Sequence, residues 1–145
     1  MDANSKTIIS EERAKEILQQ LLDYYDIELY ATSDSDADTR QAKQIERRLV
    51  RGIMCGALEL DDKDGRINVV QHLGRAIGSV DTLTYHEVSG KAKIGMSKGG
   101  KGEDYHGKLY GLLGALCNEG PMLFHSMSGV DLSRAESLGL LFLLV

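Results

Sequence analysis

The chain has 145 residues, a net charge of −5 and two cysteines, which suits one globular domain that can bury a core without a disulfide or a metal. No segment approaches the roughly 20 apolar residues of a membrane-spanning helix, and residues 1–13 lack the apolar core of a secretory signal. We therefore expect a single cytoplasmic domain over residues 1–145 with no membrane partner. Both cysteines lie in apolar segments, where a free thiol often behaves as a small buried hydrophobe.

The charges are unevenly distributed along the chain. Residues 66–111 hold seven basic and four acidic side chains, whereas residues 1–65 hold nine basic and fifteen acidic ones. Proteins that bind nucleic acid in a groove have a stronger basic excess with aromatic stacking residues among the charges. Here only Tyr105 and Tyr110 lie near the lysines, so the composition disfavours a nucleic-acid partner.

Two helices are expected in the first part of the chain. Ser10 can cap a helix over residues 10–30, because glutamates follow it directly and apolar residues then recur at helical spacing. Residues 32–38 are expected to form an acidic linker, since their Ser and Asp residues favour turns. A second amphipathic helix is predicted over residues 39–57.

Two β-hairpins are expected in the central part of the chain. The Asp64-Gly65 pair divides residues 58–70 into two short strands and is a strong turn signal. Alternating side chains predict a second pair of strands over residues 82–88 and 91–96. Neither face of this second pair is strongly apolar, so we expect the sheet to be exposed on one side or completed by another chain.

Two further helices are expected near the C-terminus. An apolar stripe begins at Leu109 and ends before the turn residues 118–121. Ser133 and Glu136 have the spacing of a capping box, so the last helix is expected to begin near Asp131. The predicted fold is therefore α+β, with two N-terminal helices, central antiparallel hairpins and two C-terminal helices.

Residues 90–111 hold seven of the sixteen glycines and five lysines, and we expect a flexible glycine-lysine loop over residues 97–104. The spacing from Gly95 to Lys101 matches a phosphate-binding P-loop, but Gly102 stands where Ser or Thr would hold magnesium. A solvated loop is the favoured interpretation. A looser anion site would use the backbone amides and ammonium groups of Lys98, Gly99, Gly100 and Lys101.

No set of residues has the types and spacing that catalysis or metal binding requires. The aspartates of residues 34–38 begin like a calcium loop, but the glycine and glutamate that such a loop needs further on are missing. The four histidines lack zinc-ligand spacing. Cys117 and His125 are separated by a Gly-Pro turn, and nothing favours a nucleophilic pair. We expect a protein that is not an enzyme and holds no metal or cofactor.

The order of features from Leu49 to Val145 resembles a known family. A helix leads into residues 56–60 (GALEL), a short β region follows, and residues 129–133 (GVDLS) precede a leucine-rich helix. This order is similar to that of the small tail assembly chaperones of tailed bacteriophages. The resemblance implies a non-enzymatic protein of the host cytoplasm that binds apolar surfaces of an extended tail protein and prevents premature assembly.

The sequence therefore predicts an interaction protein, expected to form homo-oligomers and to bind a partner protein, which the resemblance implies is a phage structural protein. We expect its interface in the apolar stripe of the C-terminal helix, formed by Leu138, Leu141, Phe142 and Val145. The alternative is a small-ligand-binding protein, in which the basic loop closes on a phosphate-bearing nucleotide or signalling molecule.

Overall fold

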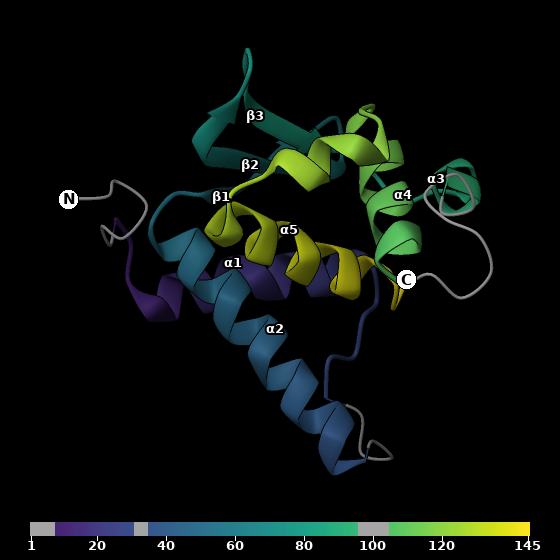
Figure 1. Ribbon diagram of the computed structural model, residues 1–145. Helices are drawn as coiled ribbons and strands as arrows, with labels where there is room; N and C mark the ends of the chain where they lie inside the picture. The colour runs from purple at the N-terminus through teal and green to yellow at the C-terminus, as the bar shows by residue number, and fades with distance from the viewer. Residues whose placement is uncertain (1–7, 31–34, 96–104) are drawn as a thin grey trace.

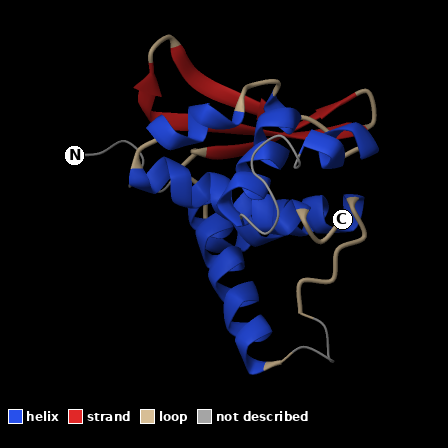
Figure 2. Ribbon diagram, turned by 45° about the vertical axis from the view of Figure 1, so that its right-hand side comes forward, coloured by secondary structure: helices blue, strands red, loops and turns tan. Residues whose placement is uncertain are grey.

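The computed structural model describes residues 8–30, 35–95 and 105–145, which form an α+β fold with a three-stranded antiparallel sheet. In chain order the elements are α1 (Glu11–Tyr24), α2 (Asp36–Met54), β1 (Leu58–Lys63), β2 (Arg66–Ile77), β3 (Val80–Tyr85), α3 (Gly90–Gly95), α4 (Tyr105–Cys117), the 3-10 helix η3 (Pro121–Ser126) and α5 (Gly129–Phe142). Figure 1 shows the sheet at one end of the molecule, with α5 beneath it and α2 extending away. Figure 2 shows the same arrangement with the strands in red above the helices.

Side-chain caps fix where the two N-terminal helices begin. The Ser10 hydroxyl accepts the backbone N–H of Arg13 at 3.2 Å, which confirms the predicted start of the first helix. The second helix begins earlier than predicted, because the Ser35 hydroxyl accepts the N–H of Asp38 and the Asp38 carboxylate accepts the N–H of Ser35. Part of the expected acidic linker is thus a cap and a first helical turn, and residues 32–34 lie outside the described residues.

The first predicted hairpin is confirmed, and the second is built differently. Asp64 and Gly65 both have positive φ, 56° and 77°, and connect β1 to β2. β2 continues to Ile77 and pairs with β3. The predicted strand over residues 91–96 is wrong, because residues 90–95 form α3, at whose start the Ser89 hydroxyl accepts the N–H of Ala92 at 3.2 Å.

The sheet has one face on the helices and one more exposed face. Inward side chains of adjacent strands, including Val69, Leu83 and Tyr85, are no more than 3% exposed. On the other face the Glu59 carboxylate lies 3.3 Å from the His72 imidazole, and the Glu59 side chain is largely exposed while that of His72 is partly exposed. This alternation is what an antiparallel sheet shows when only one side covers a core.

The C-terminal helix α5 is the centre of the core. It contacts α2, α4 and β2, and at Gly139 a Cβ would lie 2.5 Å from a methyl carbon of Leu109, so the glycine lets α4 and α5 pack closely. The helix begins at Gly129, with Ser128 as its N-cap residue. The predicted start at Asp131 was therefore two residues late, and Ser133 lies inside the helix instead of capping it.

Candidate binding groove

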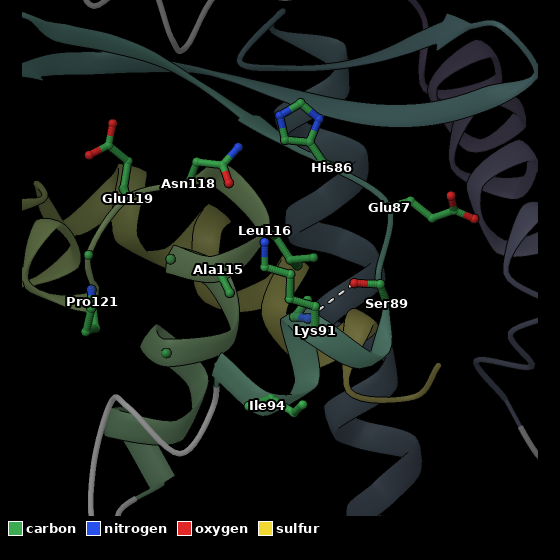
Figure 3. A pocket seen from close by; sticks show the side chains of 14 residues that line it. His86, Glu87, Ser89, Lys91, Ile94, Ala115, Leu116, Asn118, Glu119 and Pro121 are labelled. Atoms are coloured by element: carbon green, nitrogen blue, oxygen red, sulfur yellow. Dashed lines mark hydrogen bonds between the residues drawn. The ribbon is translucent and has the colours of Figure 1, made fainter.

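A groove of about 540 Å³ lies between α3, the C-terminal half of α4 and the residues that follow β3 (Figure 3). Its floor is the face of α4 that carries Gly111, Gly114 and Ala115, which have small side chains or none. Ala92 and Ile94 of α3 line a wall, and the Ile94 side chain is 69% exposed. The lining is therefore mainly apolar and open to solvent.

The turn after α4 closes one end of this groove. Asn118 has a φ of 59°, and the N–H of Glu119 donates to the carbonyl of Gly114 at 2.8 Å, which is the helix-ending pattern of a Schellman motif. A Cβ on Gly114 would lie 2.6 Å from the carbonyl oxygen of Glu119. The turn can thus fold back over α4 only because residue 114 is a glycine.

Polar side chains from three elements surround the apolar floor. In Figure 3 the side chains of Lys91 and Asn118 point into the hollow above Ala115, and the His86 ring extends away from Ala115 at the upper edge. The Glu119 carboxylate points away from it, and the Glu87 carboxylate is turned towards α1, where it accepts the Tyr24 hydroxyl at 3.0 Å. The groove thus presents nitrogen-bearing groups to its interior and carboxylates to its outside.

A second hollow of about 650 Å³ adjoins the groove, and the two share His86, Glu87 and Ser89. Lys63 and Arg66, which flank the first hairpin turn, line this second hollow. Its lining is mainly polar and contains charges of both signs, since Asp64 and Glu87 also lie there. Such a mixed lining favours no single class of ligand, so we take the apolar groove as the candidate site.

A buried carboxylate lies elsewhere, where the β2–β3 pairing shifts register over residues 72–77. The Asp131 side chain accepts the backbone N–H groups of Gly74 at 2.9 Å and Arg75 at 3.2 Å, and the Ser128 hydroxyl at 2.9 Å. Asp131 is fully buried. In a regular β-sheet these two backbone N–H groups would donate to a neighbouring strand. Here the Asp131 carboxylate accepts their hydrogen bonds instead.

The same network continues into β3 through Gln71. The Gln71 amide donates to the carbonyl of Asp131 at 2.9 Å, and its oxygen accepts the Tyr85 hydroxyl at 2.7 Å. Burial raises the pKa of Tyr85 well above its usual value. The tyrosine is therefore a neutral hydrogen-bond donor at ordinary pH, and this network explains how the sheet is fixed to α5 without invoking a reaction.

The structure describes the surroundings of Cys117 and of part of the calcium-like pattern. Burial raises the pKa of the Cys117 thiol to about 11, which is the opposite of what a nucleophilic thiolate needs. Within residues 8–30, 35–95 and 105–145 no group of three His, Cys, Asp or Glu side chains is placed to hold a metal ion. Asp36 and Asp38, part of the calcium-like pattern, lie in the first turn of α2.

Three of the four predicted interface residues lie in the core, and the predicted glycine-lysine site cannot be placed. The glycine-lysine site at residues 98–101 and the loop over residues 97–104 lie outside the described residues. In the predicted interface stripe, Leu138, Leu141 and Phe142 are at most 1% exposed, so they are core residues and their side chains are not available to a partner. Val145 is partly exposed, and its carbonyl accepts the Lys93 ammonium at 2.8 Å.

The sequence interpretation missed the groove, although one signal for it was present. Glycines at positions 107, 111 and 114 recur on one side of the helix whose other side carries the predicted leucine stripe. Such a face can neither fill a core nor hold a polar ligand through its side chains. It can, however, let another segment approach closely, which is how α4 forms the floor of the groove.

Comparisons of the chain with protein-family models, with curated proteins and with solved structures found no match. None of the helices in the described residues combines the length and the apolar composition that crossing a membrane requires.

Proposed function

We propose that this protein is a non-enzymatic assembly protein of the cytoplasm that holds an apolar segment of a partner protein in the groove between α3 and α4. The observation that carries the proposal is the open, mainly apolar groove with an exposed isoleucine on its wall. Exposed apolar surface of this kind is typical of a protein-binding site. The sequence resemblance to phage tail assembly chaperones supports the same role and suggests an extended phage structural protein as the partner.

The shape of the groove supports a peptide segment as the occupant. The floor is formed by the small residues Gly111, Gly114 and Ala115 of α4, and the groove is open instead of enclosed. Small-molecule sites bury most of their ligand in a closed cavity, whereas a segment of a partner chain can pass through an open groove. The alternative of a phosphate-bearing small ligand depended on residues 98–101, so the described residues add nothing to it.

A peptide-display selection tests the proposal. A ribosome-displayed library of random peptides of about twelve residues is selected on the wild-type protein, and enriched peptides are labelled and titrated by fluorescence anisotropy. Ile94→Ser removes an apolar side chain that is already largely exposed, so the fold should be retained. We expect this variant to weaken binding by about tenfold, because truncating an apolar side chain that contacts a partner can cost this much.

Val130→Ser is the matched control for the peptide titration. Val130 is also exposed, at 55%, but it lies at the start of α5 and does not line the groove. Binding to this variant should equal binding to the wild-type protein. A selection that yields no peptide able to distinguish wild type from Ile94→Ser would contradict the proposed function.

A further inference from the structure

Strand β1 comes first in the strand order β1-β2-β3, so it is an edge of the sheet. In the part of the chain that the structure describes, the backbone of β1 is hydrogen-bonded to β2 alone. An antiparallel neighbour uses only alternate residues of a strand, so the other backbone N–H and C=O groups of β1 are directed to its outer side. This edge can therefore accept one further strand.

A mainly apolar hollow of about 360 Å³ lies beside this edge, between β1 and α1. Leu58 and Leu60 of β1 line it, together with Ile17 of α1 and the largely exposed Ile8 that precedes α1. Apolar side chains of an added strand would meet this hollow on the face that the two leucines share. The hollow has no lining residue in common with the groove between α3 and α4, so it is a separate surface.

The other face of β1 is acidic. Glu59 and Asp61 alternate with the leucines along the strand, and both are exposed. Asp61 stands opposite the neutral Asn68 of β2, and among the described residues it has no ion-pair partner. A cationic side chain on an added strand would lie beside Asp61 with a favourable charge, whereas a second copy of β1 would bring further carboxylates to the edge. The charge therefore disfavours self-pairing and favours a basic strand.

We propose that β1 is a docking edge for an extended basic segment of a partner protein, which pairs with β1 as a fourth strand. The side chains of this segment alternate between the two faces of the sheet. Those beside Leu58 and Leu60 are apolar and extend towards the hollow, and those beside Glu59 and Asp61 are lysine or arginine. Backbone hydrogen bonds supply the affinity and the alternation supplies the selectivity, as in other cases of β-strand addition.

A labelled peptide of about seven residues, in which lysine and valine alternate, tests the docking edge by fluorescence anisotropy on wild-type protein. Two further forms carry N-methyl groups on every lysine or on every valine, so each removes one alternate set of backbone donors. We expect one form to bind at least about tenfold more weakly and the other to bind about as well as the unmodified peptide, because only one set of amides faces β1. Equal binding of the two methylated forms would overturn strand addition, as would failure of the unmodified peptide to bind at about 1 mM.

Asp61→Lys tests the match of charge at the same edge. Reversing this exposed charge should weaken binding of the lysine-valine peptide about threefold to tenfold, because a favourable cross-strand pair becomes a repulsive one. Asp81→Lys is the matched control, since it makes the same change at an exposed position of β3, on the opposite edge of the sheet. Binding to this control should equal binding to wild type. Equal weakening in both variants would mean that the peptide responds only to net charge, which overturns the docking edge.

The remaining outcomes separate this edge from other sites. Ile94→Ser should bind the lysine-valine peptide as tightly as wild type does, because Ile94 lines only the groove between α3 and α4. A loss in that variant would place the peptide in the groove, which overturns the docking edge and leaves the proposed function standing. A wild-type dimer in sedimentation velocity that Asp61→Lys alters, together with no peptide binding, would assign the edge to a second copy and also overturn the proposal.

Discussion

Gly114 is the residue at which α4 and the turn after it come into backbone contact. An added Cβ would lie 2.6 Å from the carbonyl oxygen of Glu119 and 3.2 Å from the backbone nitrogen of Pro121. Because both neighbours are backbone atoms, the whole turn would have to move. We expect Gly114→Ala to lower the free energy of unfolding by about 1–3 kcal/mol, measured by urea unfolding followed by circular dichroism.

Gly90→Ala is the control for this substitution. No heavy atom lies within 4 Å of the position that its Cβ would take, so the change should stay within about 0.5–1 kcal/mol of wild type. Equal losses in the two alanine variants would mean that the close approach at residue 114 is not what the glycine provides.

Residue-level features that act locally could be predicted from the sequence, whereas those that act across the fold could not. The Ser10 cap and the Asp64-Gly65 turn depend on neighbours within a few residues, and both were recognised. The lining of the groove could not be grouped in advance, because Lys91 and Asn118 come to line one hollow only when α3 packs on α4. Their sequence spacing carries no sign of that packing.

At the scale of elements, Asp131 fastens α5 to the irregular part of β2. Gly74 and Arg75 donate to different oxygens of this carboxylate, so replacing it by an amide puts an NH₂ group beside one of the two backbone N–H groups, which then loses its acceptor next to a buried side chain. We expect Asp131→Asn to lower the free energy of unfolding by about 2–4 kcal/mol. Urea unfolding measures the loss, and amide hydrogen exchange at Gly74 or Arg75, whichever faces the new NH₂ group, should become faster.

Asp81→Asn makes the same chemical change at an exposed position of β3. Its effect should remain within about 0.5 kcal/mol. The anchoring role of Asp131 would be contradicted if the two asparagine variants unfolded at the same urea concentration.

Helices and strands with a long apolar pattern were predicted well. The wrong strand prediction fell on a segment whose pattern covers only a few residues. The alternation over residues 91–96 is only a few residues long, and a single turn of helix satisfies it as well as a strand. The partner that β3 required was already present in β2, which continues through Gly74 to Ile77. The sequence did not predict this continuation of β2, because it contains Gly74 and glycine is depleted in strands.

At the scale of the whole molecule, burial of Cys117 links stability to alkaline pH. Burial raises the pKa of this thiol from an ordinary value of 9.0 to about 11 in the folded protein. The folded state therefore holds the proton more tightly than the unfolded state. The resulting stability is complete below pH 9 and is lost as the pH rises through about 11.

Urea unfolding of wild type and Cys117→Ala over this pH range tests the link. Tyrosines with raised pKa values also contribute to alkaline destabilisation, so the comparison uses the slope and not the absolute stability. We expect the slope of Cys117→Ala to be shallower, by about 1–2 kcal/mol over the range. Parallel slopes for the two proteins would contradict the raised pKa of Cys117.

The position of α5 in the core has a consequence for how the protein is made. Part of the apolar face of α2 is covered by α5, yet roughly 75 residues separate the end of one helix from the start of the other. At a synthesis rate of roughly 5–20 residues per second, the nascent chain would expose that face for several seconds before α5 has been synthesised. Newly made α1 and α2 are therefore the segments most in need of protection on the ribosome.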